Sequence, residues 1–320
     1  MSQPREYTNE EIKDLENKST LFHDALFQKS IDENVIIDIL SNTSNEERQI
    51  IRSCYKKQYK HPIQNDINSK LVNKLKEITI DMFDTPYEYD ARELHIALNS
   101  FTNDDNAIIE IFASRPKNHL DIVDIAYKNF YKISLREDVQ KQGSKEYSQF
   151  LLAIMDCERP IDQTISGNDA YETAKELMKN GLKAYGTDVN LFKKVFIEKS
   201  REDLILISRA FYELNKKSLY DTIDTDVKGK NRRLLKGLLF AVITPAQWFA
   251  KKIYKSIKGF GGDMRTLLRV LISRSEIDMY AIRDYYFMDR NVDIRNDIEN
   301  DIENDTNDAY GQILVNLSLK

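Results

Sequence analysis

IKGFGGDMRTLLRVLISRSEID, residues 257–278, combines a glycine loop, an amphipathic run and a helix-capping pattern. Gly259 and Gly261 let the backbone turn so that its carbonyls point outward, and such a loop can offer oxygen ligands to a hard cation. The leucines, valine and isoleucine at 267–272 have the spacing of one buried helix face. Ser275 and Asp278 then have the S-x-x-acid spacing that caps a helix start. The stretch predicts a unit of loop, helix, cap and second helix.

Three weaker copies of this unit lie upstream. Their cap positions Ser44, Pro116 and Ser200, followed by Ser275, are separated by 72, 84 and 75 residues. Repeats of this kind each hold a few short helices, so we expect four or five per copy. The predicted organisation is an N-terminal tail (1–18), repeat I (19–86), repeat II (87–156), a linker (157–170), repeat III (171–244) and repeat IV (245–320).

Composition agrees with an all-α fold. The 320 residues are 41% apolar, enough for a large core, but include only 10 glycines and 6 prolines, which is few for an all-β protein. The formal net charge of -5 repels free nucleic acid and anionic membranes on average. Binding either one would therefore need a basic patch or a bridging cation.

Cysteine use and hydropathy indicate location. Cys54 and Cys157 form no C-x-x-C motif, which suits a reducing compartment. The N-terminus lacks the apolar core of a signal peptide, and no run of about 18 uncharged apolar residues occurs. We expect a cytoplasmic protein that is neither secreted by a standard signal nor membrane-spanning.

These features resemble the annexins over nearly the whole chain. Repeat IV carries the most specific match, at Lys258, Gly259, Gly261, Arg274, Ser275, Glu276, Ile277 and Asp278, and repeat III keeps Gly181, Gly186, Thr187 and Asp188. The resemblance implies a slightly curved all-α disc of four five-helix repeats. It also implies calcium as cofactor and acidic phospholipid membranes as partner.

Repeat III has a complete set of ligands for one calcium ion. Calcium takes about six to eight oxygen ligands, of which a glycine loop offers backbone carbonyls and a distant carboxylate adds more. In the family pattern that carboxylate follows the loop by about 40 residues, and Asp226 follows Gly186 by 40. The resemblance implies a site made by the carbonyls of Gly181, Ala184 and Gly186 with the Asp226 side chain.

Repeat IV is less simple because DIEN is doubled in NDIENDIENDTNDAY. Asp301 lies 40 residues after Gly261, but an insertion of four residues would move the ligand to Asp305, which we prefer, with Asp301 as the alternative. The carbonyl donors would be Ile257, Gly259 and Gly261. A solvated acidic loop is the simpler interpretation of the same segment, and both can hold.

The first two repeats depart from the pattern. Their glycine positions carry Gln28 and Ser30 in repeat I and Ser100 and Thr102 in repeat II, and the expected carboxylate of repeat II is Gln142. We predict that neither holds the main type of calcium site. Nearby acids could form weak accessory sites, although acids at helix starts more often act on the helix dipole: Asp32, Glu33, Asp104 and Asp105. This loss of sites is similar to that in the divergent alpha-giardins.

Four residues beside the loops are candidates for membrane contact. Tyr185 and Phe260 lie at the loop tips, where an amphipathic or apolar ring suits the headgroup region, and Lys183 and Lys258 could meet lipid phosphates. Packing against a neighbouring helix is the alternative for both rings.

Other chemistry is weakly indicated. The resemblance places five residues in a polar core that would tie repeats II and IV by ion pairs: Asp90, Glu110, Arg115, Arg269 and Asp278. The four histidines show no metal or catalytic spacing, so we expect no enzyme. KGKNRR at 228–233 could touch phosphates or glycosaminoglycan but is more typical of a solvated helix start, and we expect no specific nucleic acid.

Two functions follow. The first is calcium-dependent binding to acidic phospholipid membranes through repeats III and IV. The alternative is an annexin-like scaffold, associated with cytoskeletal proteins and with little calcium dependence.

Overall fold

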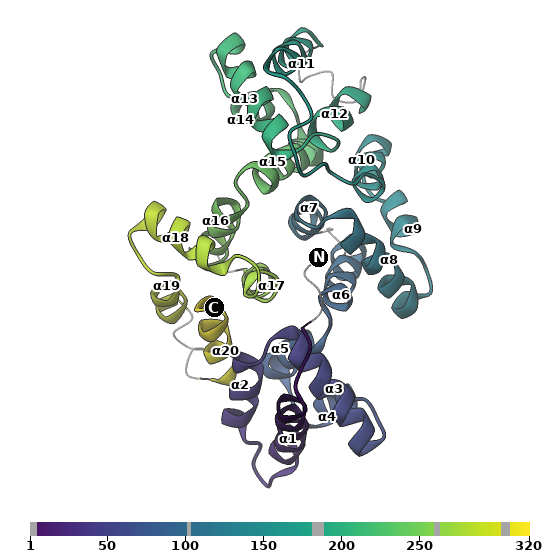
Figure 1. The fold of residues 1–320 in the computed structure, drawn as a ribbon, viewed down its shortest axis with the longest axis vertical. Helices are drawn as coiled ribbons and strands as arrows, with labels where there is room; N and C mark the ends of the chain where they lie inside the picture. Colours follow the sequence, from purple (N-terminus) through teal and green to yellow (C-terminus); the bar gives the residue numbers. More distant parts are fainter. Residues whose placement is uncertain (1–4, 101–103, 181–188, 259–262, 302–307) are drawn as a thin grey trace. The chain divides into compact units, whose positions relative to one another are not determined.

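The structure is a computed structural model that describes residues 5–100, 104–180, 189–258, 263–301 and 308–320. All regular secondary structure in these ranges is α-helical (Figure 1). None of the described helices combines the length and apolar composition that crossing a membrane requires.

Among the described residues, five helices belong to each repeat, which confirms the all-α, four-repeat prediction, although α1, α6 and α11 begin before the predicted bounds of their repeats. Repeat I holds α1 (Asn9–Phe27), α2 (Glu33–Asn42), α3 (Asn45–Tyr59), α4 (Ile63–Lys70) and α5 (Asn73–Phe83). Repeat II holds α6 (Pro86–Asn99), α7 (Asp105–Ser114), α8 (Lys117–Tyr131), α9 (Leu135–Gln140) and α10 (Lys145–Asp156). Repeat III holds α11 (Gly167–Asn180), α12 (Val189–Phe196), α13 (Arg201–Asn215), α14 (Leu219–Asp226) and α15 (Gly229–Ile243). Repeat IV holds α16 (Pro245–Lys258), α17 (Met264–Arg274), α18 (Met279–Arg290), α19 (Ile294–Asp301) and α20 (Ala309–Ser318).

The third helix of every repeat ends in the same way. Its C-cap residue has a left-handed backbone, with φ of 65°, 62°, 55° and 55° at Lys60, Lys132, Lys216 and Asn291. These positions are again 72, 84 and 75 residues apart, the spacing of the predicted caps. The left-handed C-caps therefore reproduce the repeat register independently of the capping pattern.

The predicted helix starts are confirmed in repeats I and III. Ser44 with Glu47, and Ser200 with Asp203, form reciprocal capping boxes at the starts of α3 and α13. Pro116 is the N-cap of α8, without a side-chain hydrogen bond. At the N-terminus, a further capping box on Thr8 starts α1 at Asn9, so half of the segment predicted as a tail is helical.

The prediction for Ser275 is wrong. Ser275 is the C-cap of α17, with helical φ and ψ of -52° and -35°, and α18 begins only at Met279. Asp278 is unable to complete the capping box because Arg274 holds its carboxylate, with Nε–Oδ1 and Nη2–Oδ2 distances of 2.7 and 2.6 Å. The residues of the capping pattern are present, but the Arg274 guanidinium binds the carboxylate that the capping box would need.

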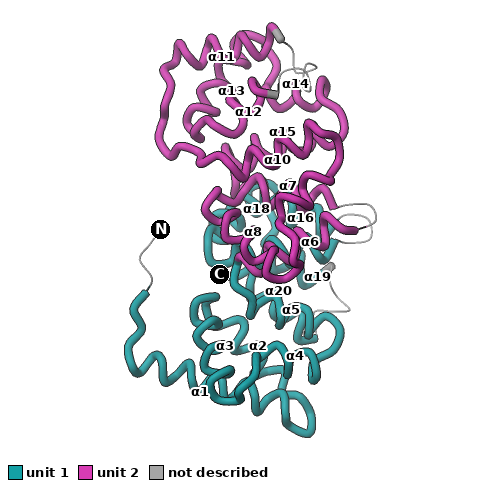
Figure 2. Tube along the Cα trace, turned by 90° about the vertical axis from the view of Figure 1, so that its right-hand side faces the viewer, with its two compact units in different colours: residues 1–86, 249–320 teal, residues 87–248 magenta. Residues whose placement is uncertain are grey.

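Two compact units divide the chain (Figure 2). Unit 1 comprises residues 1–86 and 249–320, and unit 2 comprises residues 87–248. The segment predicted as a linker lies inside unit 2, where it is attached to the start of α13: the Thr164 and Ile165 N–H groups donate to Asp203 Oδ1 at 2.9 and 3.2 Å.

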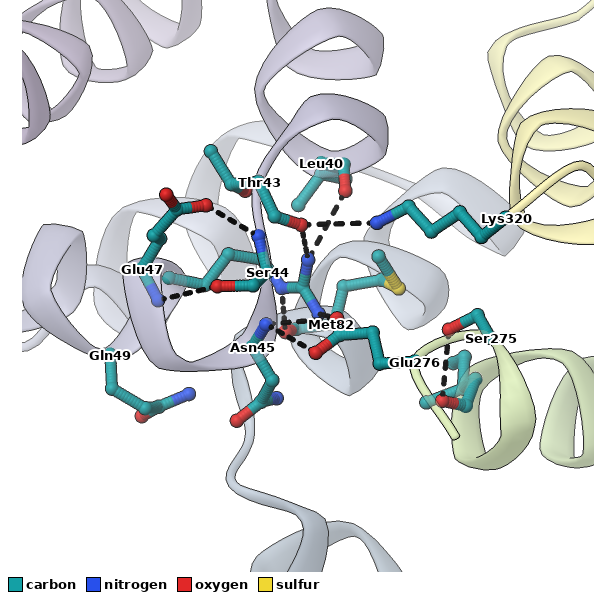
Figure 3. A network of polar contacts seen from close by, with 12 residues as sticks. Leu40, Thr43, Ser44, Asn45, Glu47, Gln49, Met82, Ser275, Glu276 and Lys320 are labelled. Carbon is teal, nitrogen blue, oxygen red and sulfur yellow. Dashed lines mark hydrogen bonds and ion pairs between the residues drawn. The ribbon is translucent and has the colours of Figure 1, made fainter. Parts of the chain in front are cut away.

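Unit 1 joins repeats I and IV through a polar network (Figure 3). Glu276 from repeat IV accepts hydrogen bonds from the Asn45 N–H, at 2.9 and 3.1 Å, and so caps the start of α3. Glu276 also pairs with Arg48 at 3.2 Å, and the buried guanidinium donates to the carbonyls of Leu40, Thr43 and Met82. Burial lowers the pKa of Arg48, and the Glu276 carboxylate opposes that change. The motif residue Glu276 thus has a structural role between two repeats.

Candidate metal site

The loop between the first and second helices of a repeat is closed by an aspartate in three repeats. The aspartate N–H donates to a carbonyl seven residues earlier, at 3.1, 3.0 and 2.8 Å: Asp32 to Ala25, Asp104 to Ala97, and Asp263 to Ser256. The same aspartate side chains accept N–H groups of the following helix and cap it. The same flanking hydrogen bond therefore occurs beside a loop with glycines, in repeat IV, and beside loops without them, in repeats I and II.

These hydrogen bonds also explain the acids of the first two repeats. Asp32 and Asp104 act as N-caps, which supports the dipole interpretation over accessory cation sites. Asp105 pairs instead with Lys230, at 2.8 Å, and with Arg233. Those two cations belong to the basic cluster at 228–233, so part of that cluster is engaged within unit 2.

In repeat I the described loop residues keep ordinary backbone geometry. Gln28 is extended, with φ of -64°, and no residue from Gln28 to Ile31 has a positive φ. A polar hollow of about 510 Å³ lies beside the loop, lined by Gln28, Ser30, Ile31, Asp32, Glu33, Asn34, Ile37, Ala309 and Gln312.

In repeat II, Ser100 donates to the Ala97 carbonyl, and Thr102 lies outside the described residues. Gln142 donates to the Leu98 carbonyl at 3.0 Å.

In repeat III the described part of the predicted site is Asp226. It is the last residue of α14, where the negative end of the helix dipole favours a cation. Its Oδ1 accepts the Thr225 hydroxyl at 3.0 Å. The other acids of α14 are engaged, Asp221 by Ser218 and Asp224 by Lys236. The remaining predicted residues of this repeat lie outside the described ranges: Gly181, Lys183, Ala184, Tyr185 and Gly186.

In repeat IV the structure places Ile257 and Lys258 at the end of α16. Ile257 is buried, and Lys258 Nζ lies 3.1 Å from Asp297 Oδ1. Lys258 can therefore reach a lipid phosphate only by leaving Asp297. Gly259, Phe260, Gly261 and Asp305 lie outside the described residues, as does the Asp301 side chain.

The helix bounds show why the distant ligand of repeat IV has two candidates. α14 ends at Asp226 and α15 begins three residues later, whereas α19 ends at Asp301 and α20 begins eight residues later, at Ala309. Asp301 corresponds to Asp226 in being the last residue of the fourth helix. Measured by distance from the start of the fifth helix, Asp305 is closer than Asp301 to the position of Asp226. Tyr310 lies in the first turn of α20, as its alignment with the start of the last helix requires.

Sequence reasoning missed a pair that anchors the fourth helix of three repeats. A tyrosine near the end of the third helix donates its hydroxyl to an aspartate eleven residues later, at 2.5, 2.6 and 2.6 Å: Tyr55–Asp66, Tyr127–Asp138 and Tyr286–Asp297. Burial, with the adjacent carboxylate, raises the pKa of each tyrosine. Repeat III has Phe211 and Thr222 in these places, and Thr222 accepts from Asn215 at 3.2 Å. The constant eleven-residue spacing was the available signal.

The predicted polar-core residues are buried, except that Arg115 and Asp278 are only partly buried. In unit 2, Asp90 contacts Arg115 at 2.7 and 3.0 Å and His119 at 2.7 Å. In unit 1, Asp278 pairs with Arg274. Glu110 and Arg269 are fully buried. The predicted ion pairs between repeats II and IV would join the two units, and they stay a prediction.

Histidines and acids do not gather elsewhere in the described ranges. There, no three His, Cys, Asp or Glu side chains lie close enough to hold a metal ion. His23 and His95 instead stack on Tyr59 and Tyr131, with ring centroids 3.9 and 3.5 Å apart. Within those ranges, side chains alone therefore offer no such cluster, whereas backbone carbonyls are the donors that glycine loops supply.

The annexin family model matches four segments of the chain, residues 18–82, 89–154, 172–238 and 248–317. The chain belongs to the annexin family. Annexin A1 of Rattus norvegicus is 29% identical over 264 residues, covering 82% of this chain and 76% of that protein. A solved structure of annexin A8 has a TM-score of 0.88 at 26% identity, covering 99% of this chain and 97% of the other. The calcium-bound structure of alpha-14 giardin has a TM-score of 0.76 at 12% identity, with 96% and 99% covered, which shows a shared fold.

Proposed function

We propose that this annexin binds acidic phospholipid membranes through calcium ions held by the loops of repeats III and IV. Annexins are a family known for calcium-dependent phospholipid binding. Because both the chain and the membrane are negatively charged, a cation shared by loop oxygens and lipid phosphate would reverse their repulsion.

The observation that carries the proposal is the environment of Asp226. Its carboxylate ends α14 with one hydroxyl as its described partner, whereas the two other acids of the helix are engaged. A carboxylate in that position can supply two oxygens to a hard cation. In repeat II the position that corresponds to Asp226 is the neutral Gln142, and the loop acids Asp32 and Asp104 of repeats I and II already cap helices.

Cosedimentation with phosphatidylserine vesicles, with and without calcium, tests the proposal. We expect binding only with calcium, and a calcium requirement raised at least about 10-fold when Asp226→Asn is combined with Asp305→Asn. Asp221→Asn, on the same helix, is the matched control and should leave binding unchanged. Comparing Asp305→Asn with Asp301→Asn identifies the ligand of repeat IV. Binding that ignores calcium, or ignores the paired substitution, would refute the proposal.

The alternative function is an annexin-like scaffold with little calcium dependence. It is favoured by the loops of repeats I and II, whose glycine positions carry side chains, and by the Lys258–Asp297 ion pair beside the fourth loop. The fold similarity to alpha-14 giardin fits either function. Calorimetric titration of the protein with calcium in the absence of lipid separates the two, because only the first function requires heat of binding that Asp226→Asn reduces.

A further inference from the structure

The third helix of repeat IV, α18, exposes large apolar side chains around a carboxylate. Tyr280, Phe287 and Met288 are 73%, 55% and 75% exposed. Asp284 is also exposed and makes no hydrogen bond or ion pair with a described residue. Positions 280, 287 and 288 lie on the same helix face as position 284, because each is three or four residues away from it.

The basic residues of α18 are engaged elsewhere and leave the charge of Asp284 uncompensated. Arg283 lies 3.7 Å from Asp293 and donates to the Leu319 carbonyl at 3.2 Å. Arg290 lies over the Tyr254 ring, 3.7 Å from its centroid. The exposed face therefore combines apolar surface with one negative charge at its centre.

The repeat fold does not require this face to be apolar. In the register fixed by the left-handed C-caps, the positions of Tyr280, Asp284, Phe287 and Met288 carry Gln49, Ser53, Lys56 and Lys57 on α3. On α8 they carry Asp121, Ile125, Lys128 and Asn129. Apolar side chains that a fold leaves in water without structural need commonly mark an interaction site.

The matching surface with opposite charge lies on α13. There the corresponding positions are Ile205, Arg209 and Tyr212, with Glu213 last. Tyr212 is 57% exposed, and Arg209 is exposed without an ion pair to a described residue. Together with Ile243, these residues line a surface hollow of about 380 Å³. Thus α13 places a cation where α18 places a carboxylate, each between apolar side chains.

We propose that α18 of one molecule packs on α13 of a second copy of this chain. Asp284 pairs with Arg209 at the centre, and the apolar side chains on either side of each charge cover the pair. Since two different surfaces meet, the contact is heterologous: the first molecule keeps a free α13 and the second a free α18, so further copies can add at either end. One helix pair buries less area than a standard stable interface, so the association is weak and depends on concentration. It involves none of the calcium ligands and is independent of the proposed membrane binding.

Sedimentation velocity of the full chain in a calcium chelator tests this contact. We expect the average sedimentation coefficient to rise between about 1 and several hundred micromolar protein. Asp284→Arg and Arg209→Asp should each weaken association at least about 10-fold, because each places like charges opposite one another. In a mixture of the two variants, both contacts between unlike molecules bring opposite charges together at positions 284 and 209, and the doubly substituted chain pairs opposite charges there with their signs exchanged. Both should therefore recover association.

Ser53→Arg, at the equivalent position of α3, is the matched control and should associate like the unchanged chain. Replacing Phe287 and Met288 with lysine, as on α3, should weaken association without changing the thermal midpoint, because both side chains are exposed. A chain that stays monomeric at all these concentrations overturns the proposal, including a chain that binds only other proteins. Charge reversals without effect, or without recovery on mixing, also overturn it.

Discussion

In repeats II and IV an arginine lies at the end of the second helix, Arg115 as the C-cap of α7 and Arg274 as the last residue of α17, and the two arginines have different partners. In unit 2, Arg115 pairs with Asp90 of α6, which also accepts from His119. In unit 1, the residue in register with Asp90 is Phe249, and Arg274 lies over its ring, 4.6 Å from the centroid, while pairing with Asp278. Asp278 is in register with His119. The acid that pairs with the arginine thus comes from the first helix in repeat II and from the start of the third helix in repeat IV, and an aromatic ring occupies the other position in each repeat.

This exchange alters where the next helix begins. In repeat II the acid comes from α6, so the chain after Arg115 is free to start α8 directly at Lys117. In repeat IV the acid lies four residues after the arginine, and α18 begins at Met279, three positions later in the repeat register. The comparison teaches that a helix-capping pattern fails when its acid is the residue that pairs with a nearby arginine, as Asp278 pairs with Arg274.

Removing the carboxylate in repeat II should have the largest effect. Asp90→Asn leaves the buried Arg115 guanidinium without its counter-charge, and breaking a buried pair in this way costs about 3–5 kcal/mol. Urea unfolding followed by circular dichroism measures the change in free energy of unfolding. Asp121→Asn, which removes the exposed Lys117 pair on the neighbouring helix, should cost less than about 0.5 kcal/mol. Equal effects of the two substitutions would contradict a buried ion pair at Asp90.

The same carboxylate should make stability depend on pH. Burial raises the pKa of Asp90, but Arg115 and the His119 hydrogen bond outweigh burial and hold that pKa well below its usual range. Because the folded pKa is depressed, the contribution is present above the unfolded value near 4 and is lost as pH falls below it. The free energy of unfolding should fall more steeply with acid in the unchanged chain than in Asp90→Asn. Parallel curves would show that Asp90 is not the titrating group.

Much of the fold could be predicted because its signals are local and repeated. The caps at Ser44 and Ser200 and the spacing of 72, 84 and 75 residues follow from short patterns, and the left-handed C-caps reproduce that spacing. Two contacts were missed although their partners are close in the sequence. Arg274 and Asp278 are four residues apart but compete with the Ser275 capping pattern, and the Tyr286–Asp297 pair was signalled only by an eleven-residue spacing that recurs in three repeats.

The candidate site was predicted less completely. Asp226 was predicted from its distance to Gly186, whereas its place at the end of α14 and the engagement of Asp224 by Lys236 depend on where α14 ends and how it packs. Lys258 looked like a lipid contact from its place beside the loop, whereas Asp297, a distant residue in the sequence, holds its ammonium.

Removing the acid in repeat IV should cost less than in repeat II. Asp278→Asn leaves Arg274 with the Phe249 ring, and Asp278 is 21% exposed, so water compensates part of the lost pair. We expect about 1–2 kcal/mol in urea unfolding, less than for Asp90→Asn. The substitution also frees position 278 from Arg274, so hydrogen exchange at residues 275–279 should change more than at the end of α18. A loss as large as that of Asp90→Asn would mean that the aromatic contact contributes nothing.

The smallest effect is expected at Ser275, where sequence and structure disagree. Ser44→Ala and Ser200→Ala remove N-cap hydrogen bonds of α3 and α13 and should each cost about 1 kcal/mol. Ser275 caps no helix start, and its hydroxyl reaches only the Ile272 carbonyl at 3.4 Å, so Ser275→Ala should cost less than about 0.3 kcal/mol. Urea midpoints of the three variants, measured side by side, give the comparison. If Ser275→Ala were as costly as Ser44→Ala, Ser275 would be a helix cap in solution, and the Arg274–Asp278 pair would not determine where α18 begins.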